Sequence, residues 1–526
     1  MIFRSPYADT TIPEMALTPF VLRRARELAD KPALIDGLSG RTITHGQLEE
    51  AVRRAASGLR QRGFQKGDVF AIFSPNLPEY AIAFHAVSLL GGIVTPINPL
   101  YTDDEVAFQL KDANAKYLVT VPQLLDKAFE AARRSQVKEV FVFGEAEGAT
   151  PFASLLESDG EVPEVSINAR EDLVALPYSS GTTGLPKGVM LTHYNLVANL
   201  RQMEAIKYIH GDDRLVCVLP LFHIYGLVVI MNMGIYMGAT IVMMPRFELE
   251  DFLGILQDHR VTLAHIVPPI VLSMMKHPSV KEYDLSNLKT IFSGAAPLGE
   301  SVSRACTERF GCLIKQGYGM TETSPVTHST PYEKEKIKFG SVGTCIPNTT
   351  CRIVDMETGV ELGPNQKGEI WVRGPQVMKG YLNRPEATAH TVDAEGWLHT
   401  GDIGYADEEG HFYIVDRVKE LIKYKGFQVA PAELEAILLA HPAIRDAAVI
   451  PSPDEEAGEV PKAFIVLKTE TNIEELLDYV AERVAPHKKI RKVEIIDQIP
   501  KTASGKILRR VLKERERGAQ EADGRQ

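Results

Sequence analysis

Short apolar runs alternate with amphipathic segments along much of the chain. Residues 69–73 form one such run, residues 80–90 carry apolar positions at helical spacing, and residues 93–95 form the next run. Short apolar runs between helical patterns are typical of buried strands in α/β proteins. The same alternation returns at residues 215–219, 240–244, 263–267 and 289–292. The pattern therefore predicts layers of helices around mostly parallel sheets.

The pattern changes twice further along the chain. Between about residues 340 and 374, short β runs separated by glycine and proline turns predict a small antiparallel region. Beyond residue 417 a compact mixture of strands and helices begins, with one helix starting at Pro431. We expect an α/β fold with a large N-terminal domain, residues 1–417, of α/β layers plus a small β region. A small α+β C-terminal domain, residues 418–526, follows it.

One uncharged stretch, residues 227–244, could be mistaken for a membrane span. Gly234 and Gly238 interrupt it, and a β-branched run then ends at Pro245. A spanning helix needs about 20 uninterrupted apolar residues. We therefore predict a buried helix, a turn and a buried strand, and no membrane span.

Composition and charge narrow the class of protein. The chain has 526 residues, 44% of them hydrophobic, and a formal net charge of −11. These values fit a globular enzyme and argue against a nucleic-acid partner, which needs a basic face. Beyond residue 417, cations cluster at residues 487–492 and at Lys501, Lys506, Arg509 and Arg510. From charge alone this cluster is interpreted as a solvated basic face.

The cysteines indicate a reducing environment. None of the five forms a CxxC pair, and the chain is too large for a disulfide scaffold. The first residues show no signal-peptide apolar run and the last three are not a peroxisomal signal, so we expect a cytoplasmic location. The cysteines, expected to be free thiols, are Cys217, Cys306, Cys312, Cys345 and Cys351.

A glycine- and hydroxyl-rich loop at residues 179–188 is the strongest local signal for a phosphate ligand. It follows an apolar run, and its glycines allow close backbone approach while its hydroxyls and Lys187 can donate to phosphate oxygens. It is not a Walker A loop, because Lys187 precedes Gly188. The competing interpretation is a flexible surface loop. The donors are Ser179, Ser180, Thr182, Thr183 and Lys187, with Gly181 between them.

This loop resembles the first nucleotide motif of the adenylate-forming superfamily, which contains acyl-CoA synthetases, luciferases and peptide-synthetase adenylation domains. Further matches follow in the family's order and span nearly the whole chain. They lie at residues 316–322, 368–374, 400–402, 416–423 and 500–506. Within the superfamily the chain is most similar to 4-coumarate–CoA ligases and bacterial cinnamate–CoA ligases, through residues 221–225, 293–299 and 423–433.

The resemblance implies ATP-dependent ligation of a carboxylic acid to coenzyme A. The carboxylate attacks the α-phosphate of ATP, pyrophosphate leaves, and the acyl-AMP then reacts with coenzyme A. The expected acid is of the 4-coumarate or cinnamate type, and a medium- or long-chain fatty acid is the alternative. A carrier-loading adenylation enzyme, a luciferase-like oxygenase and a non-enzymatic AMP-binding module are weaker alternatives. The oligomeric state stays open.

The resemblance also assigns roles to individual residues. Lys506 would bridge carboxylate and phosphate, His223 would gate the acyl carboxylate, and Glu322 would bind Mg²⁺. Lys419 would be the hinge about which a mobile C-terminal domain rotates. The implied catalytic residues are Lys506, His223, Thr182 and Glu322. The implied ATP or AMP contacts are Ser179, Ser180, Gly181, Thr182, Thr183, Lys187, Gln316, Gly317, Tyr318, Thr321, Asp402, Arg417 and Lys506. The implied coenzyme A contacts are Arg246, Lys423, Lys425 and Gly426.

The acid would lie in a pocket with one aromatic wall and several small residues. The chain departs from plant 4-coumarate ligases, which resemble one another in having a serine where Val229 stands and a lysine where Phe292 stands. A buried phenol hydroxyl without a partner costs about 1–3 kcal/mol. We therefore expect 4-coumarate to lose its advantage over cinnamate. The candidate pocket residues are Tyr225, Val229, Ala295, Gly317, Pro325 and Val326.

Overall fold

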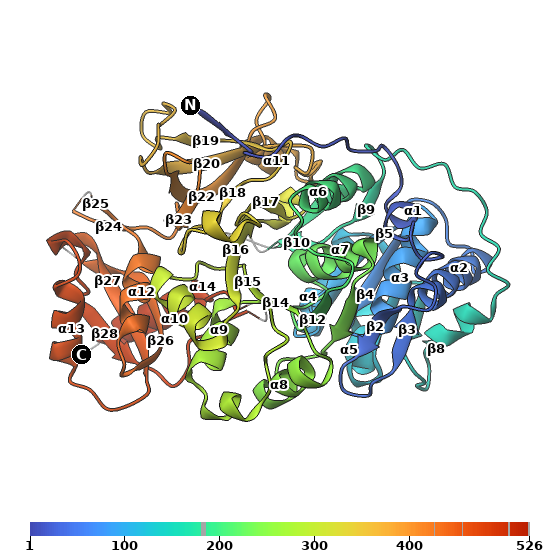
Figure 1. The fold of residues 1–526 in the computed structure, drawn as a ribbon, viewed down its shortest axis with the longest axis horizontal. Coiled ribbons are helices and arrows are strands. Elements are labelled where there is room, and N and C mark those ends of the chain that lie inside the picture. The colour runs from blue at the N-terminus through green and yellow to red at the C-terminus, as the bar shows by residue number, and fades with distance from the viewer. Residues whose placement is uncertain (180–185, 426, 455, 503–504, 524–526) are drawn as a thin grey trace.

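The computed structural model describes the chain except residues 180–185, 426, 455, 503–504 and 524–526 (Figure 1). Two large sheets form the centre, and a smaller antiparallel sheet and a C-terminal unit complete the fold. The predicted α/β fold is confirmed. The helices are α1 (Leu17–Val21), α2 (His45–Gln61), α3 (Pro78–Leu89), α4 (Asp103–Asp112), α5 (Leu125–Arg133), α6 (His193–Ala205), α7 (Met233–Met237), α8 (Leu249–Asp258), α9 (Pro268–Lys276), α10 (Glu300–Phe310), α11 (Pro385–Thr391), α12 (Pro431–Ala440), α13 (Ile473–Ala481) and α14 (Arg509–Asp523).

The first sheet has nine strands and a parallel centre, in which β9, β5, β4, β6, β7 and β8 follow one another. All five residues of β4 are buried, as expected for a strand covered on both faces. A capping box between Thr44 and Gln47 fixes the start of α2, which packs on α3. In sheet order the strands are β10 (Tyr178–Ser179), β11 (Lys187–Thr192), β9 (Leu173–Ala175), β5 (Ile93–Ile97), β4 (Val69–Phe73), β6 (Ala115–Thr120), β7 (Glu139–Val142) and β8 (Thr150–Pro151), and β21 (Gly380–Tyr381) pairs with β11.

The second sheet also has nine strands, and its parallel part runs from β16 to β2. Ligands of open α/β sheets bind outside the carboxyl ends of such strands. His223 follows β12, Arg246 follows β13, Ala295 follows β15 and Glu322 follows β16, so the topology gathers these positions at one edge. In sheet order the strands are β18 (Thr344–Cys345), β17 (Val326–Ser329), β16 (Leu313–Gly319), β15 (Thr290–Ser293), β14 (Leu263–Ile266), β12 (Arg214–Cys217), β13 (Thr240–Met243), β2 (Pro32–Asp36) and β3 (Thr42–Thr44).

The small antiparallel region predicted near residues 340–374 is present and larger than expected. Its sheet includes the N-terminal strand and two strands beyond residue 374, because their partners lie far away in sequence. In order the strands are β1 (Ile2–Arg4), β19 (Thr350–Val354), β20 (Gly368–Arg373), β22 (Leu398–Ala406) and β23 (Phe412–Arg417).

The uncharged stretch folds as its glycines and proline predict. A π-helical segment (Tyr225–Asn232) continues into α7, Gly238 ends that helix at φ 76°, and β13 follows. A positive φ at the C-terminal end of a helix favours glycine. Among the described helices, none combines the length and the apolar character that crossing a membrane requires.

The chain beyond Arg417 forms a fourth sheet with its own hydrophobic core, drawn in orange and red in Figure 1. Ile422, Leu434 and Val449 are among its fully buried residues. This unit contacts the larger part through α9, where Lys276 Nζ donates to the Ile444 carbonyl at 3.3 Å. The strands are β25 (Phe427–Val429), β24 (Ile422–Tyr424), β27 (Gly458–Leu467) and β26 (Ile444–Asp454), with β28 (Lys492–Ile495) beside β27.

The interpretation of the late cations as a solvated basic face is wrong for several of them. Arg509 is enclosed between Glu420 and Glu435, at 2.9 and 2.7 Å. Lys501 pairs with Asp446, while Arg510 is exposed. The sequence alone did not reveal these partners, because the acidic residues lie far away in the sequence, on other elements of the fold.

Candidate active site

The end of β16 carries the second nucleotide motif. Gln316 is buried, and its side-chain amide makes two hydrogen bonds with the Leu298 backbone, at 3.0 and 3.1 Å. It therefore holds the loop of residues 293–299 in place. At Gly317 a Cβ atom would come within 3.0 Å of the Phe292 ring and 3.2 Å of the His328 carbonyl, so this close approach requires glycine.

Glu322 connects the two nucleotide motifs. Its buried carboxylate accepts hydrogen bonds at Oε1 from Ser179 Oγ at 2.9 Å and from Tyr381 OH at 2.8 Å. Lys187 Nζ lies 4.9 Å from the centre of the Tyr381 ring. The two described ends of the glycine-rich loop are therefore close to Glu322, one through Ser179 and the other through Lys187 over the Tyr381 ring. Thr321 directly precedes Glu322 in the sequence. Ser180, Gly181, Thr182 and Thr183 lie outside the described residues.

Glu322 also meets the requirements of a Mg²⁺ ligand. Among the described residues both hydrogen bonds to its side chain end on Oε1, which leaves Oε2 for a cation. Hard cations such as Mg²⁺ prefer carboxylate oxygen and commonly bind through one carboxylate together with substrate phosphates. The residues present therefore fit this ion.

Asp402 lies at the centre of a second polar group. In the β22–β23 pair it stands opposite Arg417, whose Nε lies 3.0 Å from Oδ1. Tyr318 OH donates to Oδ2 at 2.6 Å. Burial, reinforced by the charge of Asp402, raises the pKa of Tyr318, so the phenol remains a donor. The predicted ribose pair is therefore in contact, with Tyr318 as a third member.

The loop that carries Lys506 lies against the large domain. Gly505 has φ 77°, and a Cβ atom there would meet Val267 at 3.2 Å and Pro269 at 3.3 Å, next to the start of α9. The Lys506 backbone N–H donates to Thr502 Oγ1 at 3.0 Å. Burial lowers the pKa of Lys506, and the positive charge of Arg417 lowers it further. Lys506 is thus close to the group formed by Asp402, Arg417 and Tyr318.

His223 is also close enough to Lys506 to feel its charge, and it is neutral. Burial lowers the pKa of His223 to about 4, and the charge of Lys506 contributes to the shift. Its Nδ1 accepts a hydrogen bond from the Tyr225 backbone N–H at 3.2 Å. A neutral imidazole that accepts at Nδ1 carries its proton on Nε2. His223 therefore offers an Nε2–H donor beside the ammonium group of Lys506.

An aromatic cluster surrounds the predicted acyl pocket. Tyr225 OH lies 3.3 Å from His265 Nδ1, and Phe292 lies 4.6 Å from Tyr208 and 5.6 Å from His265 between ring centres. The sequence analysis missed Tyr208 and His265. No local sequence signal pointed to His265, because only the β14–β15 register sets it beside Phe292.

The remaining predicted pocket residues are placed as follows. Val229, Pro325 and Val326 are buried, whereas Ala295 is exposed and has φ 66°. Among the described atoms, His265 Nε2 is buried without a hydrogen-bond partner. The residues predicted to line the acyl pocket are therefore largely apolar, and their aromatic neighbours include one polar atom, His265 Nε2, without a partner in the described part of the chain.

The predicted coenzyme A residues are not brought together. Arg246 is exposed and lies 3.5 Å from Glu248, while Lys425 forms an ion pair with Glu456. Lys423 lies in β24, and Gly426 is outside the described residues. In the part of the chain that the structure describes, no hydrogen bond or ion pair links Arg246 to β24. Lys419 lies in the turn that follows β23.

Comparisons with known proteins agree with this arrangement. The AMP-binding enzyme family matches residues 21–382, and the AMP-binding enzyme C-terminal domain matches residues 433–506. The 4-coumarate–CoA ligase 1 of Petroselinum crispum is 47% identical over 98% of this chain and 97% of its own. The 4-coumarate–CoA ligase of Pinus taeda is 46% identical over 98% and 97%.

Solved structures show the same fold. An anthranilate CoA ligase in complex with anthranoyl-AMP has a TM-score of 0.89 and 26% identity, over 96% of this chain and 97% of its own. An o-succinylbenzoate CoA synthetase from Bacillus subtilis, in complex with its acyl-adenylate, has a TM-score of 0.82 and 33% identity, over 95% and 99%. The match of both family domains, the near-complete coverage of these relatives and the shared fold show that the chain belongs to the AMP-binding enzyme family of adenylate-forming proteins.

Proposed function

We propose that this chain is an ATP-dependent acid–CoA ligase that forms an acyl-AMP and then an acyl-CoA thioester, with a cinnamate-type aromatic acid as substrate. One observation carries the proposal. The charge of Lys506 contributes to the lowered pKa of buried His223, and the charge of Arg417 lowers the pKa of Lys506, so a single buried cation is close to both the predicted acyl carboxylate and the predicted nucleotide position.

In the first half-reaction the chain supplies donors and cations. Asp402 accepts from the ribose hydroxyls, and Lys187 donates to phosphate oxygens. Lys506 neutralises charge that develops between the carboxylate and the α-phosphate, and His223 Nε2–H orients the carboxylate. When bound at Glu322, Mg²⁺ supplies further neutralisation of phosphate charge. The acyl carboxylate bonds to the α-phosphorus, and pyrophosphate leaves.

In the second half-reaction the small domain rotates about Lys419. This motion withdraws Lys506 and brings the β24–β25 hairpin, with Lys423 and Lys425, to the pocket beside Arg246. The present contacts support the first pose, since Gly505 packs against Val267 while Lys425 is paired with Glu456. Lys and Arg side chains suit the phosphate groups of coenzyme A. Thiolate attack on the acyl carbon then releases AMP.

The aromatic walls favour a flat ring over an alkyl chain. Tyr225 and Phe292 bound the pocket, and edge-to-face or offset contacts with an aromatic ring add about 0.5–1.5 kcal/mol beyond buried area. Val229 supplies no polar partner for a ring hydroxyl. A medium-chain fatty acid remains the second candidate, because the pocket is largely apolar.

A panel of four acids tests the substrate assignment. We expect kcat/KM for pyrophosphate release to be highest with cinnamate, lower with octanoate and benzoate, and not raised by the ring hydroxyl of 4-coumarate. The measurement is coupled pyrophosphate release, with coenzyme A omitted in a parallel series. A tenfold preference for 4-coumarate, about 1.4 kcal/mol, would contradict the lack of a hydroxyl partner and would point to a polar atom such as His265 Nε2. A clear octanoate preference would move the enzyme to fatty acids.

Asp402→Ala tests the nucleotide assignment. We expect the KM for ATP to rise about 10- to 100-fold, because hydrogen bonds to a charged group contribute about 1.5–3 kcal/mol and the substitution removes the ribose acceptor. The matched control is Glu409→Ala. Glu409 lies in the turn of the same β22–β23 hairpin, and its exposed carboxylate pairs with Lys338 from another segment. An unchanged KM in Asp402→Ala would exclude the ribose role.

A further inference from the structure

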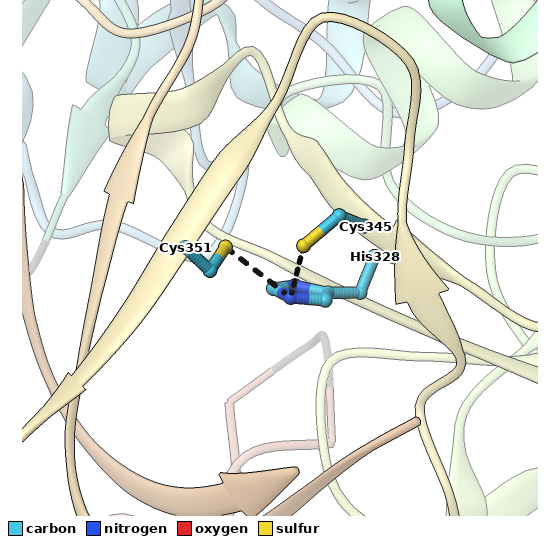
Figure 2. A group of neighbouring side chains, drawn as sticks. All are labelled: His328, Cys345 and Cys351. Carbon is cyan, nitrogen blue, oxygen red and sulfur yellow. Dashed lines mark hydrogen bonds between the residues drawn. The ribbon is translucent and has the colours of Figure 1, made fainter. Parts of the chain in front are cut away.

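A group of soft metal ligands is buried directly behind the nucleotide residues. His328 lies in β17, Cys345 in β18 and Cys351 in β19, and each is at most 1% exposed. The two Sγ atoms lie 3.5 and 3.4 Å from His328 Nε2, and all three candidate ligand atoms are within 4.8 Å of one another. Figure 2 shows both thiols directed at the same ring nitrogen. We call these three residues the thiol–histidine cluster.

The hydrogen bonds around His328 fix which nitrogen faces the thiols. Thr327 Oγ1 donates to the Tyr318 carbonyl at 3.1 Å, so its remaining capacity near His328 Nδ1, at 2.9 Å, is as an acceptor. His328 Nδ1 therefore carries the proton, and the lone pair of Nε2 faces the sulfur atoms. Metal-binding histidines are oriented in this way, by donation from the nitrogen that does not bind the metal.

The two thiols share one imidazole acceptor and lie close enough to hydrogen-bond each other. Cys345 and Cys351 are free thiols, and each approaches the same nitrogen. Nε2 has one lone pair, so it accepts one S–H, and the surroundings are apolar, with Phe412 packed on the His328 ring at 4.2 Å. A dication with two thiolates and a neutral imidazole would be electrically neutral, which an apolar site favours.

We propose that His328 Nε2, Cys345 Sγ and Cys351 Sγ bind one soft metal ion, Zn²⁺ or Cu⁺. Zinc bonds of about 2.3 Å to sulfur and about 2.0 Å to nitrogen place S and N about 3.5 Å apart at a tetrahedral angle, as the cluster already does. Binding of Zn²⁺ forms two metal–sulfur bonds and one metal–nitrogen bond, and the two thiol protons leave to solvent; with Cu⁺ one thiol keeps its proton, so that the site is again neutral. Zn²⁺ is usually four-coordinate, so three protein ligands leave it one further coordination position. Thiolates are also ligands that Cu⁺ prefers.

The position of the cluster gives the metal a structural role. His328 and Cys345 belong to the second nine-stranded sheet, and Cys351 belongs to the antiparallel sheet that carries Asp402. His328 also stands opposite Tyr318 in the β16–β17 pair. A metal held there links the two sheets whose residues Tyr318 and Asp402 meet at the nucleotide position.

The test uses the full-length protein, prepared reduced and stripped of metal, and titrated anaerobically with Zn²⁺ or Cu⁺ against a competing chelator. We expect about one equivalent of one of these ions per chain and a metal-dependent rise in Tm that the chelator reverses. Cys345→Ser and Cys351→Ser should each weaken binding at least about tenfold. Cys306→Ser, the same change at a buried cysteine of α10, should bind as the wild type does.

Three results would overturn the proposal. They are no stoichiometric binding of either ion by the wild type, undiminished binding in both cluster variants, or a native Cys345–Cys351 disulfide found by mass spectrometry of the unreduced protein. If either variant fails to fold, the wild-type stoichiometry and Tm shift still decide. Metal-protected alkylation of the wild type then shows whether Cys345 and Cys351 are the ligands.

Discussion

Replacing Lys506 by alanine is expected to lower the rate of acyl-adenylate formation about 10²- to 10³-fold, the usual effect of removing one preorganised group that stabilises transition-state charge. The reason is its position: Lys506 is a buried cation whose charge acts on His223 and whose own pKa is lowered by Arg417, the partner of Asp402. Conversion of a pre-made acyl-adenylate and coenzyme A into the thioester should survive, because Lys506 serves the first pose. Stopped-flow pyrophosphate release and thioester formation measure the two halves separately.

The matched control for Lys506→Ala is Lys501→Ala. Lys501 belongs to the same loop, but its ammonium group is engaged with Asp446 at 2.6 Å. This control should retain adenylation. An equal fall of both half-reactions in Lys506→Ala, or an equal loss in the control, would show that the loop contributes through folding rather than through one cation.

Lys419→Pro should separate the two half-reactions by a different route. Lys419 lies in a turn closed by the Glu420 N–H, which donates to the Arg417 carbonyl at 3.0 Å. Proline would fix φ at residue 419 and restrict Val418 before it. We expect adenylation to be largely kept and thioester formation to fall on the order of 10²-fold, because misplacement by about 1 Å has this cost.

The control for the hinge is Lys419→Ala, which removes the same side chain and leaves the backbone free. It should turn over nearly as the wild type does. The same two assays apply, starting either from ATP and acid or from the acyl-adenylate. Equal turnover of Lys419→Pro in both assays would exclude residue 419 as the pivot.

Much of the fold follows from the sequence because local pattern determines it. The all-apolar strand β4 and the helix α3 form where the apolar spacing of residues 69–73 and 80–90 predicts them. The motif residues Glu322 and Asp402 could be identified because their neighbours in sequence belong to a known motif. Their partners Tyr381 and Tyr318 could be located only with the structure.

What the sequence left open depends on long-range register. His265 reaches the acyl pocket because β14 pairs with β15, and Arg509 is enclosed because Glu420 and Glu435 face it from other elements. The thiol–histidine cluster was also missed. Its three residues lie on three strands, and the 17-residue and 6-residue separations from His328 to Cys345 and from Cys345 to Cys351 match no metal-binding spacing.

The turn after β23 has a further consequence for how one pocket serves two reactions. Arg417, which holds Asp402, is separated from Lys419 by a single residue. A rotation about Lys419 would move Lys506, which follows the hinge in the chain, relative to Arg417 and Asp402, which precede it. In the proposed reaction the nucleotide would therefore stay where it was bound while the catalytic groups around it are exchanged, and the reactive acyl-adenylate would not have to leave its place between the two steps.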